Sequence, residues 1–173
     1  MRRLRKSGAR VLSDLVVDTN VWVHAQNPQE ARFQDSLNFL SALQSSEVLI
    51  CLDRNFDPTG ASNTSLIGTE YLQSIPPTGF SYSVLAYLLA SSRVKSIDDA
   101  VGQAERKAIE RIVPRNKKDR RFLRVAYNSD ERHLVSHDFQ DFDSKARSMA
   151  QRDLNVTIVE AFEVILIINL PPA

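Results

Sequence analysis

The stretch LVVDTN, at residues 15–20, carries the strongest fold signal in this 173-residue chain. Three aliphatic residues in a row, two of them β-branched, are typical of a short strand that is buried on both faces. Similar runs recur later, as VLICL at residues 48–52, LVS at 134–136 and NVTIV at 155–159. We therefore expect at least four strands, each apolar along its whole length.

The segments between these runs follow the period of helices. One apolar face is formed by Phe33, Leu37 and Leu40, and another by Val101, Ala104, Ala108 and Ile112. Further helices are expected over residues 66–75, 83–91, 98–113, 119–127 and 143–152, whereas AFEVILIINL, at 161–170, fits a helix or an edge strand. Alternating strands and helices predict an α/β fold: a three-layer α/β/α domain around a central, mostly parallel twisted sheet of four to five strands.

Composition indicates an ordinary globular protein, with 43% hydrophobic and 25% charged residues. The single cysteine, Cys51, excludes a disulfide within the chain and any cysteine-based zinc site. The longest apolar run, at residues 164–168, is far shorter than the roughly 20 residues that span a membrane. We therefore expect a cytoplasmic protein without a membrane partner.

Positive charge is concentrated in two places, although the net charge is only +1. Residues 1–10 carry five bases and no acid, which predicts a basic N-terminal arm over 1–13 ahead of one folded domain over 14–173. The second cluster, RNKKDRRFLR at 115–124, carries six bases around the single acid Asp119. Such clusters can hold a polyanion, but they also occur as plain solvated surface.

Aspartates follow three of the expected strands. Asp18 and Asp53 come directly after their strands, and Asp138 comes two residues after LVS. In open parallel sheets ligands bind beyond the carboxyl ends of the strands, where the strand order reverses. Two carboxylates about 4 Å apart repel by roughly 4 kcal/mol at an effective dielectric constant near 20. A cluster there therefore predicts a hard cation such as Mg²⁺ or Mn²⁺, whereas a lone aspartate fits a turn or a helix cap equally well.

Three stretches together resemble the PIN-domain nucleases: LVVDTNVWVHA at 15–25, KDRRFLRVAYNSD at 118–130 and HLVSHDFQDF at 133–142. That family has a strand ending in Asp before Thr or Ser and Asn, then a helix of the form D-x-x-x-L-x-x-A, then a strand ending in T-x-D. The matching residues here are Asp18-Thr19-Asn20, Asp119 to Ala126, and Ser136-His137-Asp138. Ser136 stands where Thr is more common and keeps the hydroxyl group.

The resemblance implies an endonuclease that depends on Mg²⁺ or Mn²⁺ and usually cuts RNA. Its catalytic and metal-binding acids would be Asp18, Glu70, Asp119 and Asp138. Residues that hold Asp18 by hydrogen bonds would be Thr19, Asn20 and Ser136. The less secure candidates are Asp53, which competes with Glu70 for one place, Asp141, which follows Asp138 by three residues rather than the usual two, and His137.

Asp119 is also expected to cap the helix over residues 119–127. The bases around it would hold the phosphate backbone of the substrate, with Arg120 and Arg124 on one face of that helix. The full set of expected substrate-binding residues is Lys117, Lys118, Arg120, Arg121 and Arg124.

The expected partner is nucleic acid, with an antitoxin protein and a second copy of the chain as further possibilities. A toxin of a toxin–antitoxin pair and a defence or processing nuclease both fit the resemblance. The alternative is a PIN fold that has lost its activity and binds nucleic acid or protein. The intact set of four acids weighs against that alternative. A haloacid-dehalogenase phosphatase is excluded because it needs a second Asp where Asn20 stands.

Overall fold

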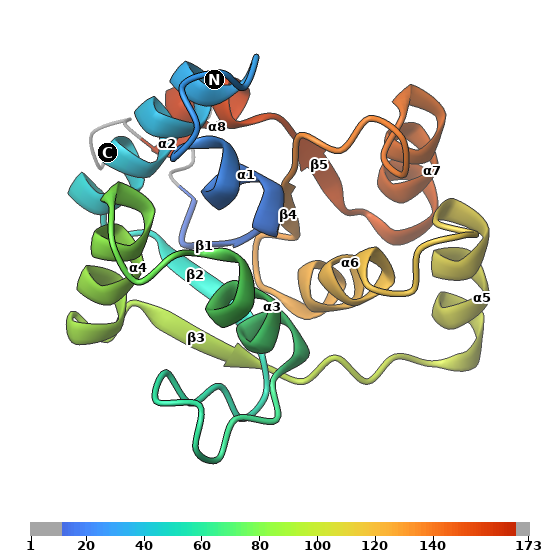
Figure 1. Cartoon of the computed structure of the whole chain (residues 1–173). Coiled ribbons are helices and arrows are strands. Elements are labelled where there is room, and N and C mark those ends of the chain that lie inside the picture. Colours follow the sequence, from blue (N-terminus) through green and yellow to red (C-terminus); the bar gives the residue numbers. More distant parts are fainter. Residues whose placement is uncertain (1–11, 169–173) are drawn as a thin grey trace, which may run out of the picture.

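The structure is a computed structural model that describes residues 12–168, and in them a five-stranded sheet has the order β3-β2-β1-β4-β5 (Figure 1). All neighbouring strands of this sheet are parallel. The strands are β1 (Asp14–Val17), β2 (Leu49–Asp53), β3 (Val94–Ile97), β4 (His133–Val135) and β5 (Thr157–Val159). The predicted α/β class with a central parallel sheet is confirmed.

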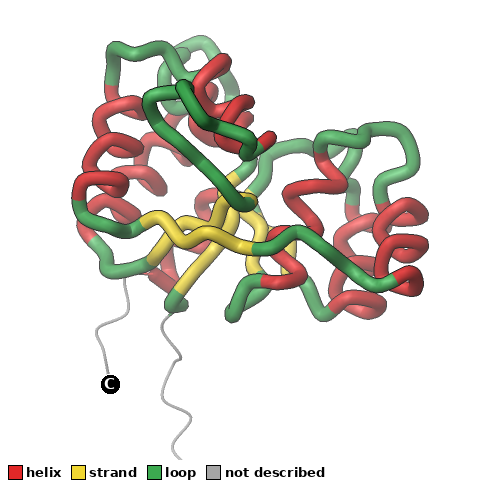
Figure 2. The backbone as a smooth tube through the Cα atoms, turned by 90° about the horizontal axis from the view of Figure 1, so that it is seen from below, coloured by secondary structure: helices red, strands yellow, loops and turns green. Residues whose placement is uncertain are grey.

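Helices pack on both sides of the sheet, which gives the three-layer arrangement visible in Figure 2. One group contains α2 (Phe33–Ser45), α4 (Phe80–Ala90) and α8 (Ala161–Ile168), and the other contains α5 (Gln103–Ile112), α6 (Asp119–Asn128) and α7 (Ser144–Leu154). Two further helices follow the ends of β1 and β2, namely α1 (Thr19–His24) and α3 (Leu66–Ser74).

The strand order reverses at β1. The chain first moves outward from β1 to β2 and β3, and then returns to add β4 and β5 on the other side. Val17 pairs with Val135, and the backbone N–H of Asp18 donates to the carbonyl oxygen of Val135 at 2.9 Å. The carboxyl ends of β1 and β4 therefore lie side by side, and this is the position where open α/β sheets bind ligands.

The core explains why β1 is apolar after Asp14, its first residue. Leu15, Val16 and Val17 are fully buried because helices cover both faces of the central strand. Beyond its end, the rings of Trp22 and Tyr71 lie 5.5 Å apart, and the Tyr71 hydroxyl donates to the carbonyl oxygen of Val17. This bond ties α3 to the end of β1, and so fixes the position of its neighbour in sequence, Glu70.

The structure differs from the expectation at β3 and at the start of α5, and it decides between the two forms expected for the C-terminal segment. The strand β3 was not predicted, because Lys95 and Ser96 make it an edge strand without an apolar run, and Lys95 pairs instead with Asp14 and Asp130, each at 2.7 Å. The helix expected to start at residue 98 starts at Gln103. The C-terminal segment is a helix to residue 168, and it packs on α2.

The described residues start inside the expected basic arm. Leu12 is already buried in the core, so the folded part extends at least two residues before Asp14. The basic residues at positions 2–10 lie outside the described residues. Among the helices of residues 12–168, none has both the length and the apolar character needed to cross a membrane.

Candidate functional site

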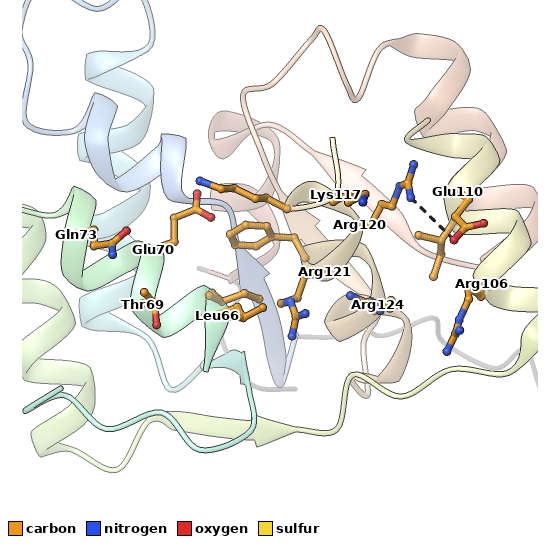
Figure 3. Close-up of a pocket in the computed structure, with 14 residues that line it drawn as sticks. Leu66, Thr69, Glu70, Gln73, Arg106, Glu110, Lys117, Arg120, Arg121 and Arg124 are labelled. Atoms are coloured by element: carbon orange, nitrogen blue, oxygen red, sulfur yellow. Dashed lines mark ion pairs between the residues drawn. The ribbon is translucent and has the colours of Figure 1, made fainter. Parts of the chain in front are cut away.

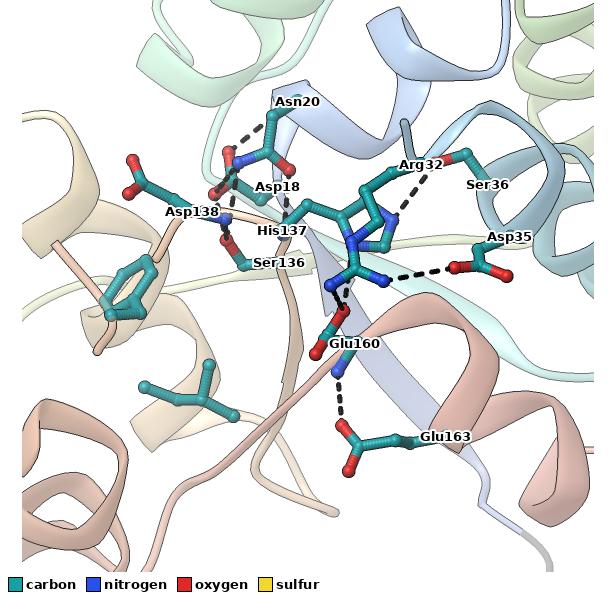
Figure 4. Close-up of polar contacts among 12 residues, drawn as sticks. Asp18, Asn20, Arg32, Asp35, Ser36, Ser136, His137, Asp138, Glu160 and Glu163 are labelled. Atoms are coloured by element: carbon teal, nitrogen blue, oxygen red, sulfur yellow. Dashed lines mark hydrogen bonds and ion pairs between the residues drawn. The ribbon is translucent and has the colours of Figure 1, made fainter. Parts of the chain in front are cut away.

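Asp18 lies at the point where the strand order reverses. It follows β1, caps α1 and is nearly buried, with 5% of its surface exposed. One of its carboxylate oxygens accepts hydrogen bonds from the Asn20 amide at 2.9 Å and from the Ser136 hydroxyl at 2.6 Å (Figure 4). The Thr19 hydroxyl, which was also expected to hold Asp18, has no hydrogen-bond partner among the described residues.

The same side chains join the loops after β1 and β4. The Asn20 side-chain oxygen accepts from the backbone N–H of His137 at 3.1 Å, and the Ser136 hydroxyl oxygen accepts from the backbone N–H of Asp138 at 3.0 Å. These bonds hold Asp138 beside Asp18 at one edge of the sheet. The Asp–Thr–Asn and Ser–x–Asp stretches are thus parts of a single hydrogen-bonded unit.

Burial raises the pKa of Asp18 to about 6. This value already includes the bonds from Ser136 and Asn20, which lower the pKa, and the negative charges of Glu70 and Asp138, which raise it. A carboxylate that is both buried and surrounded by other carboxylates destabilises the folded protein unless a positive charge compensates it.

Three further acids form a compact group. Ligand oxygens of Asp119, Asp138 and Asp141 all lie within 4.8 Å of one another, and this acidic triad could hold a metal ion. Asp119 comes from the first turn of α6, and the other two come from the loop after β4. Asp138 accepts from the backbone N–H groups of Gln140 and Asp141, at 2.8 and 2.9 Å, and this turn brings Asp141 back toward the triad.

Asp119 is the least satisfied member of the triad. Its Oδ2 atom is buried and has no hydrogen-bond partner among the described residues. Burial raises the pKa of this carboxyl group well above its usual range, and the charge of Asp18, a side-chain hydrogen bond with Asp141 and the charges of Asp138 and Asp141 add to the effect. A buried oxygen without a partner costs free energy, which a bound cation would recover. The expectation that Asp119 caps α6 is wrong, because Lys118 occupies the cap position and Asp119 is the first helical residue.

Glu70 and Asp53, the two rivals for one place, have different surroundings. Glu70 lies on α3, points toward α6 and raises the pKa of Asp18 by its charge (Figure 3). Asp53 is buried, pairs with Arg121 at 3.3 Å and accepts hydrogen bonds at the start of α3 from Ser65 Oγ (2.5 Å), Leu66 N (2.8 Å) and Ile67 N (3.1 Å). Asp53 therefore anchors α3, and the acid directed toward the site is Glu70.

The arginines of the basic run have partners within the chain. Arg120 donates to the carbonyl oxygens of Val113 and Pro114, at 2.7 and 2.6 Å, just after the end of α5. Asp99 pairs with Arg121 at 3.2 Å and with Arg124 at 3.5 Å. Lys117 and Lys118 are exposed and form no ion pair within residues 12–168. The two lysines are thus the more available cations.

A cleft of about 600 Å³ lies between α3, α5 and α6, and Glu70 is the site acid that lines it (Figure 3). It is lined from α3 by Leu66, Ile67, Thr69, Glu70 and Gln73, from α5 by Arg106, Ile109 and Glu110, and from α6 and the residues before it by Lys117, Lys118, Arg120, Arg121, Phe122 and Arg124. Sequence reasoning did not find this cleft. The available signal was the spacing of Leu66, Thr69, Glu70 and Gln73, which places them on one face of α3.

His137 faces away from the acids, into the packing between the loop and α2. Its ring lies 3.0 Å from the Ser36 hydroxyl, 3.8 Å from a Glu160 carboxylate oxygen, and 5.6 Å from the ring of His24, on which it stacks. Burial lowers its pKa to about 4, and His24 and Arg32 lower it further, so the ring is neutral at pH 7. This geometry assigns His137 to the support of the loop rather than to contact with a substrate.

The partners of His137 extend that support. Arg32 pairs with Glu160 at 2.9 Å, and its guanidinium lies over the ring of Phe139, 5.3 Å from the centroid. Sequence reasoning gave no role to Ser36, Arg32 or Glu160, because they lie far apart along the chain and belong to no local pattern.

A scan against models of protein families and a search of curated proteins found no match to this chain. The geometry of the site is therefore the basis for assigning a function.

Proposed function

We propose that this protein is a divalent-metal-dependent endonuclease that hydrolyses phosphodiester bonds, with RNA as its substrate. The observation that carries the proposal is the gathering of Asp18, Asp119, Asp138 and Asp141 where the strand order reverses, with one buried Asp119 oxygen left without a partner among the described residues. Repulsion between these carboxylates disfavours the fold unless a cation lies among them. The similarity of the motifs to PIN-domain nucleases supports RNA as the substrate.

The donor set suits a hard cation. All three members of the triad offer carboxylate oxygens, which Mg²⁺ and Mn²⁺ prefer over softer ligands. A bound ion of this kind would supply an activated water and would neutralise charge on a phosphate group. Asp119, Asp138 and Asp141 would hold it, and Asp18 and Glu70 lie close enough to raise the negative potential around it.

The remaining residues position these acids and attract the substrate. Asn20 and Ser136 fix the Asp18 carboxylate, and the Ser136 hydroxyl also fixes the backbone of Asp138. Lys118 precedes Asp119 directly and is exposed beside the cleft. A phosphate backbone attracted to this lysine would pass close to the triad, because the two residues are adjacent in sequence.

The test is cleavage of an end-labelled single-stranded RNA with Mn²⁺ or Mg²⁺, followed on a denaturing gel. We expect internal cuts that stop when EDTA is added. Asp119→Asn and Asp138→Asn should each lower the rate by at least about hundredfold, as expected for a lost metal ligand. Glu47→Gln, which removes an exposed acid far along the chain from the site, should leave the rate unchanged.

Two results would contradict the proposed nuclease activity. One is RNA binding without cleavage at any metal concentration, which would favour a nucleic-acid-binding module. The other is cleavage that persists undiminished in both asparagine variants, which would place the activity elsewhere or in a contaminant.

A further inference from the structure

The cleft between α3, α5 and α6 is lined by no member of the acidic triad, but two of its lining residues connect it to the acids. Glu70 lines it and also acts on Asp18, and Lys118, the neighbour of Asp119 in sequence, lines it as well. Anything bound in the cleft would therefore lie next to the proposed site of hydrolysis.

The floor of the cleft is apolar. Ile67, Ile109 and Phe122 line it but are each about 1% exposed, so they form a packed base under Leu66 and offer little surface of their own. Leu66, at the start of α3, is 52% exposed although it is a large aliphatic residue. An exposed leucine over a packed apolar base is typical of a site that accepts a flat or aliphatic group.

The rim of the cleft is cationic. Arg106, Lys117 and Lys118 are exposed and form no ion pair within the described part of the chain. Arg124 pairs with Asp99 through one terminal nitrogen, but its Nε is buried and has no hydrogen-bond partner there. The cleft thus combines an apolar floor with several cations that face solvent, and the acids Glu70 and Glu110 do not balance them.

We propose that this cleft binds one unpaired nucleotide of the substrate, with the base against Leu66 and the adjoining phosphate at the cationic rim. The inference rests on the proposed function and deepens it, because it defines which form of nucleic acid is bound. Every base has an apolar face that stacks on such a surface, whereas a base within a duplex has both faces covered by its neighbours.

The proposal has consequences for substrate choice. The bound nucleotide lies beside the scissile phosphate, because the cleft and the acids share Glu70 and the region around Lys118. Gln73, an exposed amide on the same face of α3 with no hydrogen bond within residues 12–168, offers a donor and an acceptor to the base edge. A single strand, or a loop with an unstacked base, therefore fits the cleft and a continuous duplex does not.

The experiment measures binding, so it does not depend on catalysis. Fluorescence anisotropy in EDTA measures the affinity for a fluorescein-labelled 12-nucleotide RNA, for the same strand annealed to its complement, and for a series of strands with one abasic position each. The same series made of DNA shows whether the protein distinguishes ribose from deoxyribose. The variant is Leu66→Ala, which truncates an exposed side chain. The control is Leu166→Ala, which truncates a leucine on α8 that is even more exposed than Leu66 and does not line the cleft. Thermal unfolding checks that both variants are folded.

We expect the single strand to bind more tightly than the duplex, and one abasic position to weaken wild-type binding by about 5- to 150-fold, the range for loss of one stacked base. That penalty should shrink to less than about twofold in Leu66→Ala and persist in Leu166→Ala. Equal binding of duplex and single strand, or an abasic penalty that Leu66→Ala leaves intact, would overturn the proposal. The proposal would also be overturned if Leu66→Ala weakened the binding of an acidic peptide of Glu-Leu repeats and left RNA binding unchanged. If the binding results are as expected but no RNA is cleaved, the proposed nuclease activity is wrong and the proposed nucleotide site stands.

Discussion

At the scale of single residues, two carboxylates of the site lower the stability of the folded protein because they are buried without a compensating positive charge. Asp18 is buried among like charges, and Asp119 has a buried oxygen without a partner in the described part of the chain. Asp14 and Asp53 are equally buried, but each is surrounded by donors: Asp14 by Lys95 and two backbone N–H groups, and Asp53 by Arg121 and the start of α3. Acids of the second kind stabilise the fold, whereas acids of the first kind destabilise it unless a cation binds beside them.

The pKa of Asp18 predicts how stability changes with pH when no metal is bound. An aspartate in water has a pKa of 3.8, whereas the pKa of Asp18 in the folded protein is about 6, so the folded state holds the proton more tightly. The stabilisation from this group is therefore complete below about pH 4 and is lost as the pH rises through about 6. In EDTA, Asp18→Asn should become more stable than wild type by about 3 kcal/mol at pH 7, with little difference at pH 4.

Urea unfolding at a series of pH values measures this difference. A variant that is less stable than wild type at every pH would show that the bonds from Asn20 and Ser136 outweigh the repulsion.

Substitution of Asp53 should have the opposite effect on stability: it should destabilise the folded protein. Asp53→Ala removes the acceptor for two backbone N–H groups of α3 and leaves Arg121 with a single partner, Asp99. We expect a loss of about 2–3 kcal/mol in the free energy of unfolding, with Mn²⁺ affinity changed by less than about twofold. Calorimetric titration with Mn²⁺ checks the second part, and a tenfold weaker binding would return Asp53 to the metal site.

At the scale of secondary-structure elements, α6 and the residues just before it supply both a proposed metal ligand and proposed substrate-binding lysines. Its buried face, which includes Phe122, Val125 and Ala126, packs on β1, β2 and β4 as the sequence predicted. Its first turn presents Asp119 to the other acids, and the two lysines before it face the cleft.

The salt dependence of RNA binding separates the free cations from the structural ones. Lys117→Ala with Lys118→Ala should flatten the slope of log affinity against log salt by about 1.4, since each phosphate contact of a single strand contributes about 0.7. Arg120→Ala should leave the slope nearly unchanged, because its guanidinium is bound to Val113 and Pro114. Equal slopes for the lysine variant and wild type would show that the RNA phosphates do not contact Lys117 and Lys118.

The elements that the sequence predicted are those with a local signal. The apolar runs of β1, β2, β4 and β5 gave their positions within one or two residues, and the aspartates at or after the ends of β1, β2 and β4 marked the carboxyl edge of the sheet. The edge strand β3 was missed, because half of its residues are polar and Lys95 is held by partners from other elements. In the same way, the pairing of Arg121 and Arg124 with Asp99 depends on the packing of α6, which no short motif encodes.

At the scale of the whole molecule, the site depends on the order of the strands. The acids come from residues 18, 70, 119, 138 and 141, and they meet because β4 returns to lie beside β1. The His137, Ser36 and Glu160 contacts then fix the loop after β4 against the opposite layer of helices.

A bound cation should therefore stabilise the entire domain. At 100 times its dissociation constant, Mn²⁺ should add about 2.7 kcal/mol to the free energy of unfolding, which corresponds to a Tm higher by roughly 5–10 °C for a domain of this size. Differential scanning calorimetry measures the shift. It should vanish in a variant that combines Asp119→Asn with Asp138→Asn, and a shift of equal size there would show binding at another site.

The position of a bound metal ion shows directly whether the acidic triad is a metal site. A crystal soaked in Mn²⁺ and measured for anomalous scattering should show a peak within about 2.0–2.5 Å of carboxylate oxygens from Asp119, Asp138 and Asp141. The same experiment on Asp119→Asn should show the peak lost or strongly reduced. A Mn²⁺ peak elsewhere in the molecule, with none among these three acids at saturating metal, would contradict the account.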